Sequence, residues 1–234
     1  MLRPKKKISK REIKEDELLM AYARVSAFYY GHKKYVSYAI TALILVVAVI
    51  FVVINNRRAN NEKAAVELAK VVTLYEAAAN NPKAYQQAID GQPERGVMGL
   101  KTIVDNYGNT ESGQLARFYL ANAYFNLGKY DDAMKNYENF SGGNKLLEAS
   151  ALAGMGACHE AKGEFEKAAS SYEKAAATVS NTTNTPEYLN SAARCYARAG
   201  AKEKAIALLK RLKQDYPTST YAREVDRYIS EFST

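Results

Sequence analysis

The segment Leu120–Phe140 reads LANAYFNLGKYDDAMKNYENF, and its pattern returns in Met155–Ala175 (MGACHEAKGEFEKAASSYEKA) and Ala192–Leu212 (AARCYARAGAKEKAIALLKRL). One glycine of each segment aligns with the others, at spacings of 35 and 37 residues: Gly128, Gly163 and Gly200. A period near 34 residues is typical of solenoids built from stacked helical hairpins. The sequence therefore predicts an all-α fold over this part of the chain.

Other positions repeat with the glycine, and each has a mechanical reason. A small residue follows five positions later, where two helices cross closely: Ala133, Ala168 and Ala205. A large residue comes four positions after that one: Tyr137, Tyr172 and Leu209. Ahead of each glycine, a small residue and a ring fill matching positions: Ala121 and Tyr124, Gly156 and His159, Ala193 and Tyr196. The glycine itself is expected to end the first helix of each hairpin in a left-handed conformation.

These positions make the chain resemble the tetratricopeptide repeat family over about Gln114–Thr234. The aromatic residue usual at the start of the first helix is absent, because Arg117, Leu152 and Leu189 stand there. The proline that often closes a repeat appears once, as Pro217.

A degenerate unit is predicted ahead of these repeats, within residues 55–113. Arg95–Ala116 matches Lys204–Ala222 in spacing, so Arg95–Tyr107 is expected to be a second helix. Its first helix would be the periodic stretch Ala59–Ala79, ended by Asn80, Asn81 and Pro82. A last amphipathic helix, Tyr221–Phe232, would cap residues 114–234. We expect about three to four hairpins in total, enough to bury a continuous core.

Twenty residues without a charge, Tyr35–Ile54, precede the repeats (YVSYAITALILVVAVIFVVI). As a helix they would measure about 30 Å, the thickness of a bilayer core. The alternatives are a buried core helix and a cleaved signal peptide. A buried core helix rarely lacks polar residues on every face, which argues against the first alternative. No small-x-small cleavage site follows the stretch, which argues against a signal peptide. We therefore expect a single transmembrane helix over residues 35–54.

The net charge of +8 is concentrated ahead of this span. Residues 1–34 hold ten Lys/Arg against four Asp/Glu, whereas residues 55–234 hold 23 against 21. A nearly neutral repeat domain does not favour nucleic-acid binding. A short Lys/Arg-rich tail stays in the cytoplasm, although Arg57 and Arg58 argue mildly for the reverse orientation. We predict a cytoplasmic tail, a bacterial inner-membrane location and a periplasmic C-terminal domain; the tail either sets this topology or also binds acidic lipid or ribosomal RNA.

The whole layout resembles the ancillary SecYEG translocon subunit family, which combines a basic tail, one span, a long linking helix and a periplasmic tetratricopeptide-like domain. That resemblance implies a membrane-tethered adaptor that contacts translocon subunits or periplasmic chaperones. The stretch Asp215–Ala222 is also similar to periplasmic cell-division and outer-membrane assembly repeat proteins. An envelope-assembly or cell-division scaffold is therefore the alternative.

No motif predicts an enzyme, a metal site or a cofactor. His32 lies at the border of the span, and His159 occupies the ring position of its repeat. Metalloprotease, serine hydrolase, phosphate-loop and paired-cysteine motifs are absent from the sequence. Cys158 and Cys195 fall at equivalent repeat positions, which packed helices hold about 10 Å apart, too far for a disulfide. We expect two buried free thiols.

A protein or an extended peptide is the expected ligand, bound along the concave face that the first helices of the hairpins line. The residues predicted on that face are Phe118, Asn122, Phe125, Asn126, Glu160, Asn190, Arg194 and Arg198. The alternative is a solvated face with no particular ligand.

Overall fold

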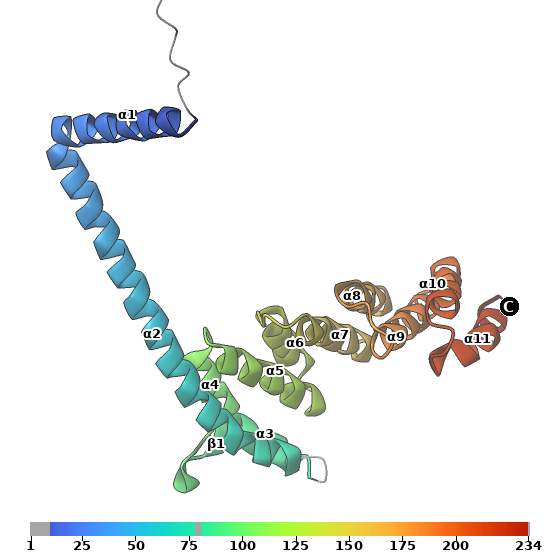
Figure 1. Cartoon of the computed structure of the whole chain (residues 1–234). Coiled ribbons are helices and arrows are strands. Elements are labelled where there is room, and N and C mark those ends of the chain that lie inside the picture. Colours follow the sequence, from blue (N-terminus) through green and yellow to red (C-terminus); the bar gives the residue numbers. More distant parts are fainter. Residues whose placement is uncertain (1–9, 78–80, 234) are drawn as a thin grey trace, which may run out of the picture. The chain divides into compact units, whose positions relative to one another are not determined.

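A computed structural model describes residues 10–77 and 81–233 of the chain. In these residues the structure has eleven α-helices, two short 3-10 helices and one two-stranded sheet (Figure 1). The all-α prediction for the repeat region is confirmed. The chain divides into two compact units, residues 1–56 and residues 57–234, which are described separately below.

The first unit contains α1 (Lys10–Gly31) and the beginning of α2 (Lys33–Ala77), with an interruption at His32. Helix α1 was not predicted, and the basic residues 1–9 lie outside the described part of the chain. Large apolar side chains of α2 are exposed, including Leu43 at 63% and Phe51 at 72%. Helix α2 is long and apolar enough, by length and composition, to cross a membrane.

The second unit begins with the rest of α2, whose inner face carries the buried residues Ala64, Leu68 and Val71. These side chains share a core with residues of α3 (Lys83–Asp90), α4 (Leu100–Tyr107) and α5 (Glu111–Asn126). The predicted linking helix is thus one continuous helix with the apolar span. Its predicted end at Ala79–Asn80 lies outside the described residues.

The predicted helix Arg95–Tyr107 is wrong in its first turn and right in the remainder. Helix α4 begins at Leu100, and the residues before it form a hairpin of β1 (Gly91–Gln92), η1 (Pro93–Arg95) and β2 (Val97–Met98). Gly91 and Gly96 have φ of 85° and 66°, which a right-handed helix cannot contain. Helix α3 was not predicted either; its eight residues bury only Ala84, Ala88 and Ile89.

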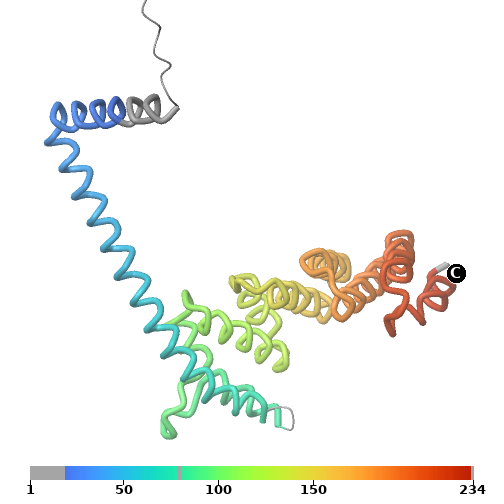
Figure 2. The backbone as a smooth tube through the Cα atoms, viewed as in Figure 1, coloured from blue at the N-terminus to red at the C-terminus, as the bar shows by residue number. Residues whose placement is uncertain are grey.

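Three regular hairpins follow along the chain, and Figure 2 shows their backbone succession. They are α5 with α6 (Tyr130–Glu138), α7 (Lys145–Ala161) with α8 (Phe165–Thr178), and α9 (Thr185–Arg198) with α10 (Lys202–Asp215). Each hairpin turns at its repeat glycine, with φ between 73° and 80° at Gly128, Gly163 and Gly200. The residue after each glycine donates its backbone N–H to the carbonyl oxygen five residues earlier, and the N···O distance is 2.9 Å in all three turns. The predicted left-handed glycine ending is confirmed.

The repeat positions predicted for close packing are buried. Ala133, Ala168 and Ala205 are 0% exposed, and the large residues four positions later are at most 8% exposed. Glycines let the rings approach the first helices: a Cβ on Gly156 would lie 3.1 Å from the Tyr172 ring, and one on Gly154 would lie 2.4 Å from the Tyr137 ring. In both of these contacts a tyrosine ring lies against a glycine of α7.

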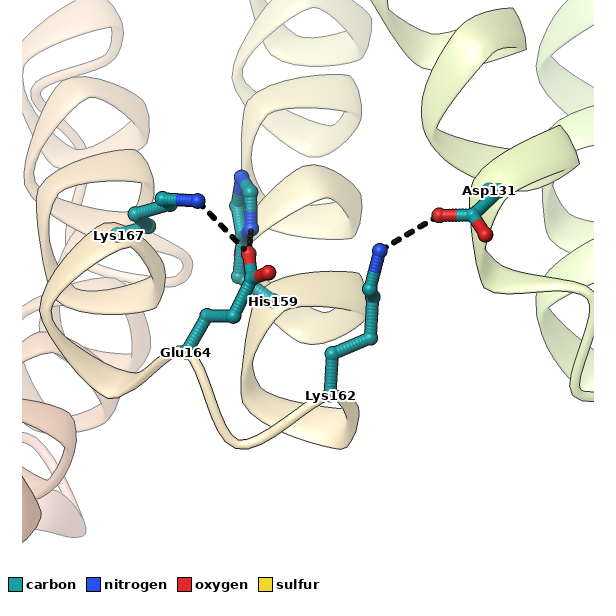
Figure 3. Close-up of polar contacts among 5 residues, drawn as sticks. All are labelled: Asp131, His159, Lys162, Glu164 and Lys167. Carbon is teal, nitrogen blue, oxygen red and sulfur yellow. Dashed lines mark hydrogen bonds and ion pairs between the residues drawn. The ribbon is translucent and has the colours of Figure 1, made fainter.

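Polar contacts at the α7–α8 turn tie the second hairpin together and join it to the first (Figure 3). His159 Nδ1 lies 2.7 Å from Glu164 Oε2, and Lys167 Nζ lies 3.3 Å from the same oxygen. Both contacts lower the pKa of the Glu164 carboxyl, and the hydrogen bond to His159 has the larger effect. Lys162 Nζ reaches Asp131 Oδ1 of α6 over 2.6 Å. The ring position of this repeat therefore carries a structural histidine.

The capping segment comprises η2 (Tyr221–Glu224) and α11 (Val225–Ser233) rather than one continuous helix. Ala222 and Val225 are buried in the same core as Leu208 and Leu212 of α10. The segment covers the end of the last hairpin, as the spacing of its apolar residues predicts.

Candidate protein-binding groove

The first helices of the three hairpins, α5, α7 and α9, carry all eight residues predicted for the groove. On α5, Phe118 packs its ring against Tyr137 and Phe140, with centroids 6.1 and 5.7 Å away. Phe125 lies 5.6 Å from the Tyr130 ring in the same way. Both phenylalanines are only partly buried.

The two asparagines of α5 differ in what holds them. Asn122 Oδ1 accepts a hydrogen bond from the hydroxyl of Tyr137, a residue that is 4% exposed. Asn126 is exposed, and its Nδ2 donates to the Asn122 carbonyl over 2.8 Å. Asn122 therefore satisfies a buried hydroxyl, whereas Asn126 is held only by a bond within its own helix.

We expect Asn122→Ala to lower the free energy of unfolding by about 1–3 kcal/mol, because it leaves the buried Tyr137 hydroxyl without its acceptor. Asn126→Ala on the same helix is the matched control and should change stability by no more than about 0.5 kcal/mol. Chemical denaturation followed by circular dichroism measures both. Equal stability of the two variants would show that Asn122 is free for a ligand rather than used by the fold.

Three predicted residues from α7 and α9 meet in one ionic cluster. Glu160 Oε1 accepts from Arg194 Nη2 at 3.2 Å and lies 3.5 Å from Arg198 Nη1. Its other oxygen accepts from the Tyr172 hydroxyl at 3.3 Å. Arg198 also lies over the Phe165 ring, 5.2 Å from its centroid. Two guanidinium groups share one carboxylate, so the cluster presents surplus positive charge.

Asn190, the eighth predicted residue, is 6% exposed. It lines a hollow of about 330 Å³ together with Arg194 and residues of the capping segment. A second hollow, of about 340 Å³, adjoins it and is lined in part by Lys202, Tyr228 and Phe232. The sequence analysis treated the capping segment as a cover alone, so it missed Tyr228 and Phe232; it also did not assign Lys202, in the first turn of α10, to the binding face. The only signal was the amphipathic spacing of Tyr228 and Phe232.

A larger hollow lies elsewhere, among the turns that join hairpins. It measures about 660 Å³ and is lined by Arg57, Thr110, Gln114 and the stretch from Phe140 to Asn144, among others. Gln114 spans two of these turns: its amide donates to the Gly108 carbonyl and its Oε1 accepts from Ser141 N at 2.8 Å. Because this polar bridge holds adjacent turns together, we regard the hollow as part of the scaffold and not as a binding site.

Cys158 and Cys195 are free and fully buried, as predicted. Burial is the main cause that raises the pKa of the Cys158 thiol from 9.0 to about 11 and that of Cys195 from 9.0 to about 12. Neither thiol has the low pKa that reactive cysteines need. Within the described residues, no three His, Cys, Asp or Glu side chains are grouped closely enough to hold a metal ion.

We expect both thiols of the folded protein to resist a maleimide at pH 8 and to react when the protein is unfolded in guanidinium. The raised pKa values also make stability depend on pH. The folded state keeps thiol protons that the unfolded state releases above pH 9.0, so this contribution is complete below pH 9.0 and is lost as the pH rises toward 11–12. Rapid labelling of the native protein, read by intact mass, would contradict the burial of both residues.

Comparison with known proteins identifies the class of the repeats. Tetratricopeptide repeat family models match residues 118–181 and 191–219. Repeats of this class are protein-interaction modules whose stacked hairpins make an extended binding surface.

Among solved structures, the chain is similar to the nearly identical TPR-like repeats of a putative kinesin light chain from Podosopora anserina. One structure, of a substituted form of those repeats, is 14% identical, with a TM-score of 0.47 over 70% of this chain and 95% of that one. A second structure of the repeats is also 14% identical, with a TM-score of 0.46 over 71% and 96%. No curated protein matches the chain.

Proposed function

We propose that this chain is a membrane-tethered adaptor that binds extended segments of other proteins in the groove of α5, α7 and α9. One observation carries the proposal: a 45-residue helix is apolar and exposed in its first half, and tetratricopeptide repeats follow it along the chain. Exposed apolar surface of this length needs a lipid or protein cover.

The orientation is proposed from the charges that flank the span. Lys/Arg-rich short tails remain cytoplasmic, and residues 1–34 carry a surplus of six positive charges. The repeats would then lie in the periplasm of a bacterium. In that compartment the chain would meet proteins as they leave the translocon, and the chaperones that receive them. We propose translocon subunits or periplasmic chaperones as the partners.

The groove supports a protein ligand through its chemistry. Phe118 and Phe125 offer ring faces near one end, and Arg194 and Arg198 offer guanidinium donors near the other. Aromatic and arginine side chains are the residues most enriched at protein interfaces. An extended peptide presents backbone carbonyls and alternate side chains to such a surface.

The test is purification of the tagged full-length protein in mild detergent, with the bound proteins identified by mass spectrometry. Arg194→Glu reverses a charge in the groove, and Arg211→Gln changes an exposed arginine of α10 that pairs with Asp215 in its own helix. We expect translocon subunits and periplasmic chaperones to be recovered with the Arg211→Gln variant and reduced with Arg194→Glu. Recovery of division or outer-membrane assembly factors without translocon subunits would replace this proposal with the scaffold function.

A further inference from the structure

The second half of α1, residues 19–31, exposes much apolar surface although it lies outside the predicted span. Its large apolar side chains are between 42% and 77% exposed: Leu19, Met20, Tyr22, Val25, Phe28, Tyr29 and Tyr30. Arg24 is the only charged residue in the segment, and the Ser26 hydroxyl donates to the Ala23 carbonyl of the same helix at 3.0 Å. Exposed apolar surface of this extent marks a contact with lipid or with protein.

The segment is too short to cross a bilayer and cannot lengthen the span. Thirteen helical residues measure about 20 Å, whereas a bilayer core is about 30 Å thick. The span begins at Tyr35, and the helix is interrupted before it, at His32. One straight helix over both segments would measure about 54 Å, so it would leave residues 19–31 in water or draw Lys33 and Lys34 into the hydrocarbon. Exposed apolar helices of this length are typical of the membrane interface.

The chain itself keeps the segment beside the span. Only His32 separates α1, which ends at Gly31, from α2, which begins at Lys33. Consecutive Cα atoms are about 3.8 Å apart, so Gly31 lies within about 15 Å of Tyr35 whatever the angle between the two helices. A membrane that receives the span is therefore within reach of the apolar segment.

The side chains of the segment suit the headgroup layer. Tyr22, Tyr29 and Tyr30 are three of its seven exposed large side chains, and tyrosine rings concentrate at the boundary between lipid and water. At about 100° per residue, Tyr22 and Tyr29 share one side of the helix and Arg24 lies on the opposite side. An arginine on the water side can pair with anionic headgroups while the rings enter the lipid.

Apolar side chains surround the helix instead of forming one stripe, which favours lipid over a protein partner. At about 100° per residue, Leu19, Met20 and Val25 point in three directions that are about 100° or more apart. A helix that packs on a protein needs an apolar stripe only about 100° wide. Fluid lipid chains, in contrast, can cover several sides of a helix that is embedded at the headgroup boundary.

We propose that residues 19–31 form an interfacial helix that lies in the plane of the membrane, with Arg24 toward water and Tyr22, Val25 and Tyr29 toward the acyl chains. In the proposed orientation this helix occupies the cytoplasmic leaflet. The inference rests on the proposed membrane tether and adds a second contact with lipid. It differs from attraction of the basic tail to acidic lipid, because apolar side chains make the contact.

The test uses the absence of tryptophan from the chain, so that one introduced indole reports on one position. Full-length Tyr22→Trp and Tyr29→Trp are each reconstituted in phosphatidylcholine–phosphatidylglycerol vesicles. The vesicles contain lipids brominated near the headgroup or near the chain ends. We expect the shallow bromine to quench both indoles more strongly than the deep bromine, and to the same extent in both variants. A helix along the membrane normal would place the two indoles about 10 Å apart in depth.

Two single-tryptophan references calibrate the measurement. Val47→Trp, in the middle of the span, should be quenched most by the deep bromine. Leu146→Trp lies on α7, where the leucine is 43% exposed, and should be quenched by aqueous iodide and by neither bromolipid. A further variant adds Val25→Asp and Tyr29→Asp to Tyr22→Trp, and its indole should move from lipid to water.

Salt separates apolar insertion from attraction of charges. At about 1 M salt the screening length falls to about 3 Å, so contact through basic residues alone would be lost. Quenching of the indoles at residues 22 and 29 by bromolipid should remain unchanged. Loss of that quenching would overturn the apolar contact in favour of the basic tail.

The remaining outcomes also decide the proposal. Quenching of both indoles by iodide but not by bromolipid would place the segment in water and overturn it. Protection from both quenchers would mean a cover of protein, from a second copy or another partner, and would also overturn it. In these cases, deep quenching of Val47→Trp leaves the membrane tether standing. If Val47→Trp is not quenched by bromolipid either, the tether and the interfacial helix fail together.

Discussion

Replacement of Gly113 by alanine should destabilise the repeat domain by about 3 kcal/mol. A Cβ at this position would lie 1.8 Å from the Tyr107 carbonyl oxygen and 2.4 Å from its carbon, both of which are backbone atoms. Backbone atoms cannot rotate away as the end of a side chain can, so α5 must move relative to α4. The intrinsic preference of helices for alanine over glycine, about 1 kcal/mol, offsets only part of this cost.

The close approach at Gly113 is fixed by the turn that joins α4 and α5. Thr110 is 1% exposed; its hydroxyl donates to the Tyr107 carbonyl at 2.7 Å and accepts from Gly113 N at 3.1 Å. The aligned turn near the C-terminus has Ser219 and Ala222 at these positions, with the Ala222 N–H also donating to the serine hydroxyl at 3.1 Å. There the chain enters the 3-10 turn η2 instead of an α-helix. Alanine at residue 113 should therefore displace the first turn of α5.

Two other glycines provide a scale for this measurement. Gly143 is exposed, has no atom within 4 Å of an added Cβ and does not have a positive φ, so Gly143→Ala should change stability by no more than about 0.5 kcal/mol. Gly128 has the same open space but a φ of 73°, so Gly128→Ala should cost about 1 kcal/mol from backbone strain alone. Urea unfolding in detergent, followed at 222 nm, compares all three. Gly113→Ala as stable as Gly143→Ala would contradict the close approach.

The sequence predicted the three regular hairpins well because each of their rules is local. A glycine at a fixed distance from a small residue and a ring specifies both the turn and the crossing, and Gly128, Gly163 and Gly200 all adopt it. The degenerate unit ahead of them followed a different rule. Gly96 was aligned with a helical alanine, but in the structure it turns a β-hairpin that no repeat position specifies. Composition gave no means of separating a helical glycine from a hairpin glycine.

The groove was less predictable than the fold because its chemistry depends on contacts across helices. Helical spacing placed Glu160, Arg194 and Arg198 on a common face, and the structure brings them together. The same spacing could not show that the Tyr137 hydroxyl uses Asn122, or that the capping segment encloses Asn190. Those contacts join residues 15 or more positions apart through side chains whose directions a periodic pattern does not fix.

Two acidic substitutions at the centre of the apolar stretch should release the chain from the membrane. Leu45 and Val47 are 62% and 57% exposed in α2, so Leu45→Asp with Val47→Asp leaves the buried cores of the repeat domain intact. Each aspartate at the centre of a span costs about 2.5–3.5 kcal/mol of insertion free energy, and the pair shifts the equilibrium by more than about a thousandfold. After carbonate extraction, the wild type should remain in the pellet and the double variant should move to the supernatant.

The matched control is Ser37→Asp, which adds a charge at the entering end of the same stretch, where the headgroup layer is polar. It should remain in the pellet. Protease resistance of the released double variant checks that its repeats are still folded, so that release reflects lost insertion and not aggregation or degradation. A double variant that stays in the pellet with the wild type would mean that the exposed face of α2 is covered by protein instead of lipid. The tether would then be a partner subunit.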